Sequence, residues 1–154
     1  MIYWQTGSKV EVRAKLDAVP PSTAHLLVIE DDAGFSASMK RLLNGAGYEV
    51  TIASRGGDGL QALSEMAPDL VLADINLPDM TGHDVIRAAR QQGIDVPVIV
   101  VSGESEIDAA ILALRLGALD FVRKPIEPEI LLHSVARALA QRSLEREHKA
   151  ACFR

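Results

Sequence analysis

Residues Pro68-Asp69-Leu70-Val71-Leu72-Ala73-Asp74 form an apolar run that ends on a carboxylate. The run is too short for a helix, and the loop Leu77-Pro78-Asp79-Met80-Thr81-Gly82 follows it, so the pattern is typical of a buried parallel strand. Asp74 is therefore predicted to lie at the carboxyl end of a strand. In open α/β sheets, ligands and chemistry gather at that edge.

Similar short apolar segments lie on both sides of this run, and a helix-like pattern follows each of them. The expected strands cover residues 25–29, 48–53, 68–74, 96–101 and 119–122. The segments between them carry apolar residues at helical spacing, as Phe35, Met39 and Leu43 do. Strict alternation of strand and helix predicts an α/β domain with a doubly wound parallel sheet, helices on both faces and right-handed crossovers.

Glycines mark the expected ends of several helices. Three of them are predicted to stop a helix in the left-handed conformation: Gly47, Gly93 and Gly117. Gly56, Gly57 and Gly59 lead into a short helix over 60–66 and match no phosphate-cradling fingerprint, so we interpret them as turn residues.

The last two helices are expected to differ in character. The helix after residue 105 has apolar positions 107, 110, 111 and 114, with Leu112 and Leu116 off its inner face, and Ser105 is a candidate cap. The final helix begins near Pro128 and has one apolar face. The charged tail 143–154 is interpreted as a helical extension or a linker.

Length and composition exclude several classes of protein. The 154 residues suit one domain with tails, and residues 1–23 look like an irregular leader. The net charge of −5 argues against direct nucleic-acid binding. A single cysteine, Cys152, permits no internal disulfide, and apolar runs are too short to cross a membrane. We expect a cytoplasmic protein.

Polar groups follow four of the expected strands. They are Glu30, Asp31 and Asp32 after the first strand, Asp74 on the third, Ser102 on the fourth and Lys124 after the fifth. In a doubly wound sheet these strand ends converge on one crevice. Carboxylates brought together repel one another unless a cation intervenes, and hard oxygen ligands suit Mg²⁺. The set indicates a phosphoryl-transfer site with Asp74 as the nucleophile.

The combined pattern resembles the response-regulator receiver domain, the phosphoacceptor module of two-component signalling. The motifs that carry the resemblance are Leu27-Val28-Ile29-Glu30-Asp31-Asp32, Leu72-Ala73-Asp74-Ile75-Asn76-Leu77-Pro78-Asp79-Met80-Thr81-Gly82, Val100-Val101-Ser102-Gly103 and Gly117-Ala118-Leu119-Asp120-Phe121-Val122-Arg123-Lys124-Pro125-Ile126. The likeness covers residues 24–142. It implies a flavodoxin-like (βα)5 sheet of strand order 2-1-3-4-5 and a cis peptide bond at Lys124-Pro125.

The resemblance also implies the ligands of a metal ion. Asp74 corresponds to the phosphorylated aspartate, Asp31 to a direct ligand, and Glu30 to a ligand acting through water. The backbone carbonyl of Asn76 corresponds to the third protein ligand. The implied cofactor is Mg²⁺, with Mn²⁺ as an alternative.

The remaining roles concern the phosphoryl group and the response to it. The resemblance makes Ser102 the hydroxyl that closes on the phosphoryl group, Lys124 its ionic partner and Phe121 the aromatic switch residue. Asn76 and Glu104 are placed to influence the water that removes the phosphate. Thr81, where an acid is usual, and Glu30, where aspartate is common, depart from the family pattern without removing a required group. Phe121, in place of the frequent tyrosine, leaves the switch without a hydroxyl.

The implied partner is a histidine kinase or a phosphotransfer protein. The output would be a further domain beyond Arg154, or self-association through the helix at 107–116, the strand at 119–122 and the last helix. Self-phosphorylation and slow autodephosphorylation are the only catalysis expected. The alternative is an Asp-nucleophile, Mg²⁺-dependent phosphatase of the dehalogenase type, which normally has a second Asp where this chain has Asn76.

Overall fold

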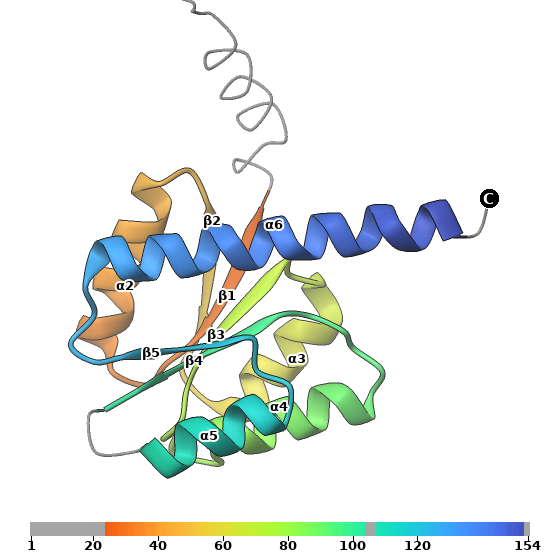
Figure 1. The fold of residues 1–154 in the computed structure, drawn as a ribbon. Coiled ribbons are helices and arrows are strands. Elements are labelled where there is room, and N and C mark those ends of the chain that lie inside the picture. The colour runs from red at the N-terminus through yellow and green to blue at the C-terminus, as the bar shows by residue number, and fades with distance from the viewer. Residues whose placement is uncertain (1–23, 104–106, 153–154) are drawn as a thin grey trace, which may run out of the picture.

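The computed structural model describes residues 24–103 and 107–152. Its sheet consists of the parallel strands β1 (His25–Ile29), β2 (Glu49–Ala53), β3 (Leu70–Asp74), β4 (Val98–Ser102) and β5 (Asp120–Arg123), in the order 2-1-3-4-5 (Figure 1). The helices are α2 (Ala33–Gly45), α3 (Gly56–Met66), α4 (Gly82–Gln91), α5 (Ile107–Arg115) and α6 (Pro128–Cys152). The predicted fold class and strand order are confirmed.

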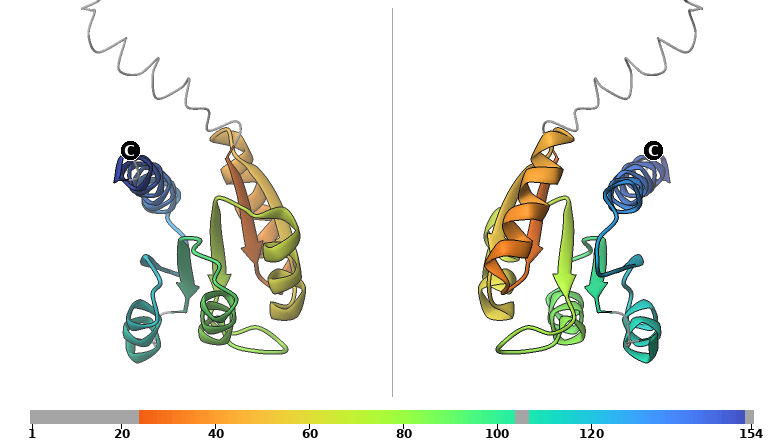
Figure 2. Two further views of the ribbon diagram at one scale, coloured as in Figure 1. Left: turned by 90° about the vertical axis from the view of Figure 1, so that its right-hand side faces the viewer. Right: turned by 90° about the vertical axis from the view of Figure 1, so that its left-hand side faces the viewer.

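Helices cover both faces of the sheet, which is why its central strands β3 and β4 are apolar up to their last residues, Asp74 and Ser102. Every residue of β3 and β4 is buried. The helices α2 and α6 pack on one face, and α3, α4 and α5 pack on the other. In both views of Figure 2, α6 lies well apart from α4 and α5, which lie next to each other.

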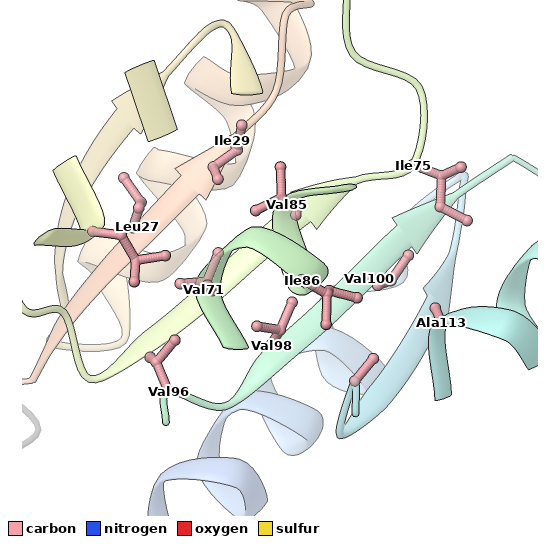
Figure 3. Packing of buried hydrophobic residues seen from close by; sticks show 14 of the residues in the cluster. Leu27, Ile29, Val71, Ile75, Val85, Ile86, Val96, Val98, Val100 and Ala113 are labelled. Atoms are coloured by element: carbon pink, nitrogen blue, oxygen red, sulfur yellow. The ribbon is translucent and has the colours of Figure 1, made fainter. Parts of the chain in front are cut away.

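Alternate residues of each strand enter two separate hydrophobic cores. Val71 and Val98 point toward α4, where they meet Val85 and Ile86 (Figure 3). The neighbouring strand residues point the other way, toward Met39 and Leu43 of α2 and Leu131, Val135 and Ala138 of α6. Full burial of one such side chain stabilises the fold by about 1.5–3 kcal/mol.

Most helix ends follow the predicted signals. Positive φ values of 99°, 76° and 111° occur at Gly47, Gly93 and Gly117, as predicted for glycines that follow helices. Thr81 and Asp84 form a reciprocal capping box at the start of α4. The leader 1–23, Glu104 and the proposed cap Ser105 lie outside the described residues.

The interpretation of Gly56, Gly57 and Gly59 as turn residues is wrong. All three lie inside α3, which begins at Gly56. The physical reason is close packing, because a side chain at Gly59 would collide with the buried Ile29. Glycine costs about 1 kcal/mol in a helix relative to alanine, and here it permits the helix to approach the sheet.

The apolar face expected for α5 is wrong at three of its four positions, since only Ala110 faces the core as expected. Ala110 and Ala113 face the core, whereas Ile107, Ile111 and Leu114 are exposed by 65%, 45% and 47%. The small alanines bring α5 close to the sheet, and the larger side chains form an apolar stripe on the surface. Exposed apolar patches of this kind are typical of interaction surfaces.

The last helix is fixed to the sheet and then continues past it (Figure 1). Asp120 of β5 accepts hydrogen bonds from the Ser134 hydroxyl at 2.6 Å and from Arg137 at 2.7 Å. The charged tail forms a helix as far as Cys152. None of the helices in the described part of the chain combines the length and apolar character needed to span a membrane.

Candidate functional site

Three carboxylates meet at the carboxyl ends of β1 and β3. The register pairs Ile29 with Ala73, so the residues that follow them, Glu30 and Asp74, lie side by side. Oxygens of Glu30, Asp31 and Asp74 all lie within 4.8 Å of one another. Glu30 and Asp74 are buried, with 3% and 7% exposed, whereas Asp31 is open to solvent.

The ammonium group of Lys124 holds the two buried carboxylates. Its Nζ donates to Glu30 Oε1 at 2.9 Å and to Asp74 Oδ2 at 3.1 Å. The same nitrogen lies 4.3 Å from the centre of the Phe35 ring, a favourable cation–π distance. Burial lowers the pKa of Lys124, but the hydrogen bonds to Glu30 and Asp74 outweigh burial and raise the pKa.

Glu30 is the most perturbed acid of the cluster. Burial raises its pKa to about 7, and the nearby charge of Asp74 acts in the same direction. The hydrogen bonds from Lys124 and from the backbone N–H of Asp32, which lies 3.1 Å from Glu30 Oε2, oppose the rise. A further positive charge at this position would favour the ionised form of Glu30.

The pairing of β4 with β5 brings Ser102 to the same edge as Lys124. Ser102 lies opposite Arg123 in the ladder, and the backbone N–H of Lys124 donates to the Ser102 carbonyl at 2.7 Å. The Ser102 side chain is fully buried, and its hydroxyl donates to the Gly103 carbonyl at 3.2 Å. The Lys124-Pro125 peptide bond is cis, as predicted.

The loop after β3 brings Asn76 beside Asp74. The backbone N–H of Asn76 donates to Asp74 Oδ1 at 3.1 Å, and Asn76 itself is exposed. The N–H of Gly82 donates to the Ile75 carbonyl at 2.7 Å, which closes the base of the loop. Each carboxylate oxygen of Asp74 therefore accepts a hydrogen bond, Oδ1 from the backbone of the loop and Oδ2 from Lys124.

The donor set fits a small hard cation. Carboxylate oxygens of Glu30, Asp31 and Asp74 gather at one place, and Asn76 adds a backbone carbonyl in the adjoining loop. A site with a small number of protein ligands, all of them oxygen atoms, suits Mg²⁺, because this ion retains several waters and commonly bridges to phosphate.

Several known proteins are similar to this chain in sequence and in fold. The family model described as the response regulator receiver domain matches residues 26–136. The chain belongs to this family. The receiver sequence is 38% identical over 112 residues to the luminescence regulatory protein LuxO of Vibrio campbellii, and 38% identical over 119 residues to the transcriptional regulatory protein PrrA of Mycobacterium leprae.

These matches cover 73% and 77% of this chain, and 25% of LuxO and 50% of PrrA. The receiver thus spans between a quarter and half of the length of these relatives. Among solved structures, a CheY-like receiver domain protein from Methanospirillum hungatei has a TM-score of 0.75 and 31% identity, covering 79% of this chain and 98% of that chain. Receiver domains of this kind are generally signalling modules.

The structure brings most of the residues singled out in the sequence into one place. Glu30, Asp31, Asp74 and Lys124 are in mutual contact or close proximity, and Ser102 and Asn76 adjoin them. Phe121 lies apart from these contacts, half-buried, and packs against the core on the side of α3, α4 and α5.

Two residues near the site, Phe35 and Asp79, make contacts that the sequence does not indicate. Phe35 was assigned only to the inner face of a helix, yet its ring contacts the Lys124 ammonium. Asp79 was quoted only as part of a loop, yet its carboxylate binds the start of α3. Both contacts join segments far apart in sequence, so no local pattern could have indicated them.

Proposed function

We propose that Asp74 accepts a phosphoryl group from a phosphohistidine of a partner histidine kinase or phosphotransfer protein. The observation that carries this proposal is the Lys124 ammonium, which lies 3.1 Å from Asp74 and 2.9 Å from Glu30 at the edge of the acidic cluster. A nearly buried carboxylate between a cation and a set of hard oxygen ligands suits nucleophilic attack on phosphorus.

The proposed transfer conserves atoms and charge. An Asp74 carboxylate oxygen bonds to phosphorus, the bond from phosphorus to the donor's ring nitrogen breaks, and its electron pair stays on that nitrogen. Asp74 becomes an acyl phosphate. Asp31, Asp74 and the Asn76 carbonyl would hold Mg²⁺ directly, with Glu30 acting through water, and the bound ion would neutralise charge on the phosphoryl oxygens. Lys124 and Ser102 supply the other partners of those oxygens.

Phosphorylation would change the balance of charge at the sheet edge. An aspartyl phosphate carries about −1.5 to −2 charges and new acceptor oxygens. The Ser102 hydroxyl, which now donates to the Gly103 carbonyl, would turn toward them. We propose that this movement, with Phe121 as the switch residue, shifts a pre-existing equilibrium at the surface of α5, β5 and α6. Asn76 and Glu104 would tune the return by hydrolysis.

The exposed stripe of Ile107, Ile111 and Leu114 supports this surface as the output. The signal would pass there to a second copy of the chain or to a further domain. In this proposal residues 24–142 act as the receiver, residues 143–154 as a helical linker, and the protein works in the cytoplasm. Direct binding of nucleic acid is not part of the role of this segment.

Phosphorylation by acetyl phosphate in the presence of Mg²⁺ tests the function. The wild-type protein should gain one base-labile phosphate, and Asp74→Asn should gain none. Asp58→Asn, which changes an exposed carboxylate in the first turn of α3, is the matched control and should be phosphorylated normally. Undiminished phosphate on Asp74→Asn would refute the assignment, and steady turnover of a generic phosphate ester would favour a phosphatase.

A further inference from the structure

The loop between β3 and α4 carries Asn76 and is closed at its base. The backbone N–H of Leu77 donates to the Met80 carbonyl at 3.2 Å, and an isolated antiparallel bridge joins Asn76 to Thr81. At Gly82 a Cβ would lie 2.7 Å from the Asp74 carbonyl oxygen, so the chain passes directly against the end of β3. The base of the loop is therefore fixed close to the acidic cluster.

The tip of this loop is bound to a different element, the start of α3. Asp79 Oδ1 accepts the N–H of Gly56 at 2.8 Å, and Oδ2 accepts the N–H of Gly57 at 2.9 Å. Within the described chain, the N-cap residue Arg55 provides no side-chain cap for this helix. Asp79 fulfils that role from 22 and 23 residues away, with charge-assisted bonds at the positive end of the helix.

An apolar contact reinforces this attachment. Met80 packs over Gly56, and a Cβ at that position would collide with the methionine side chain, reaching within 2.6 Å of its Sδ. Any residue with a Cβ at position 56 would force the Met80 side chain to shift. The glycines at the start of α3 thus provide two N–H groups and the space for Met80. The hydrogen bonds also lower the pKa of Asp79, which keeps it ionised.

We propose that Asp79 is a positioning residue for the cation site: by binding the start of α3, it fixes the loop that carries the Asn76 carbonyl. The inference rests on the proposed function, in which that carbonyl is a ligand of Mg²⁺. A ligand held in place before binding loses less freedom when the cation arrives. Without Asp79, the loop would keep its internal bonds at Asn76 and Leu77 but lose its attachment to α3, so the loop and the Asn76 carbonyl with it would be free to shift relative to that helix.

Calorimetric titration with Mg²⁺ tests the inference. Asp79→Ala should weaken Mg²⁺ binding by roughly 10-fold, the lower end of the effect of losing an outer-shell partner. Asp79→Asn keeps one acceptor oxygen and should show a smaller loss. Asp58→Asn removes an exposed charge from the same turn of α3 and should bind Mg²⁺ like the wild type.

Two further readouts separate positioning from a general loss of stability. Amide hydrogen exchange at Gly56 and Gly57 should accelerate in Asp79→Ala in the absence of Mg²⁺. The rate of phosphorylation by acetyl phosphate should fall at low Mg²⁺ and return to near the wild-type rate at saturating Mg²⁺. This split between apparent affinity and maximal rate is not expected from a residue that only stabilises the fold.

The outcomes distinguish the two proposals. If wild-type protein binds Mg²⁺ and is phosphorylated on Asp74, but both Asp79 variants bind Mg²⁺ with unchanged affinity, the positioning role is overturned and the function stands. If Asp79→Ala does not fold, the titration of Asp79→Asn decides in the same way. A wild-type protein that fails to bind Mg²⁺ overturns both proposals.

Discussion

Replacing Lys124 by methionine removes the charge that neutralises two buried carboxylates while keeping most of the side-chain volume. At an effective dielectric constant of about 20, the pair at 2.9 Å is worth roughly 6 kcal/mol and the pair at 3.1 Å roughly 5 kcal/mol. Desolvation offsets much of this attraction, and breaking one side of a buried pair typically costs about 3–5 kcal/mol. Because the Lys124 side chain is 27% exposed, we expect a loss of about 3 kcal/mol near pH 8.

The loss should depend on pH and on Mg²⁺. It should be smaller near pH 5.5, because a protonated Glu30, whose pKa is about 7, no longer repels Asp74. Excess Mg²⁺ should stabilise Lys124→Met more than it stabilises the wild type, since the ion supplies the missing positive charge. Urea unfolding followed by far-ultraviolet circular dichroism, in EDTA and in Mg²⁺, measures both effects.

The matched control is Lys40→Met, which removes an exposed lysine of α2 and should change stability by less than about 0.5 kcal/mol. If Lys124→Met is as stable as the wild type in EDTA near pH 8, the Lys124 charge does not stabilise the folded state. A loss of the same size at both pH values would show that repulsion between Glu30 and Asp74 is not its cause.

Three further predictions concern single contacts. Because folding raises the pKa of Glu30 from 4.5 to about 7, the metal-free protein should lose about 3 kcal/mol of stability as the pH rises from 4.5 to about 7. Urea unfolding at a series of pH values measures this loss, and Glu30→Gln should make the stability less dependent on pH over that range. Gly59→Val should cost about 1–3 kcal/mol through collision with Ile29, whereas Gly45→Ala, with open space around it, should be neutral or stabilising in the same assay. Asp120→Ala should cost about 1–2 kcal/mol by leaving the buried Ser134 hydroxyl without its acceptor, and thermal unfolding would measure it; no change would exclude that bond as a support of α6.

The strands and their order could be predicted because their signal is local. Residues 70–73, which lead up to Asp74, are all apolar, and such a run is typical of a strand that is covered on both faces of the sheet. The alternation of such strands with helices then leaves few possible topologies. The same reasoning places Glu30 beside Asp74 and Ser102 beside Lys124, since each follows from the ends of neighbouring parallel strands.

The surroundings of the site could not be predicted because they depend on contacts between distant segments. The spacing of Ile107, Ile111 and Leu114 is that of a buried helix face, yet the two small residues Ala110 and Ala113 decide which side of α5 approaches the sheet. Sequence periodicity gives the angle between side chains and not which side a neighbouring element covers. The glycines of α3 look like turn residues in the sequence, because their role depends on contacts with distant residues, Met80 at Gly56 and Ile29 at Gly59.

Gly56 and Gly59 of α3 allow this helix to contact both segments that carry the clustered carboxylates and Asn76, the end of β1 and the loop after β3. Ile29, which packs over Gly59, is the last residue of β1 and directly precedes Glu30; Met80, which packs over Gly56, follows Asp79 in the loop that carries Asn76. The first turns of α3 therefore support the segments on both sides of the cation site without contributing a ligand. A rigid helix packed against both segments fixes their relative position. Substitutions at Gly56 or Gly59 should consequently alter Mg²⁺ affinity as well as stability, although the clustered carboxylates belong to other residues, Glu30, Asp31 and Asp74.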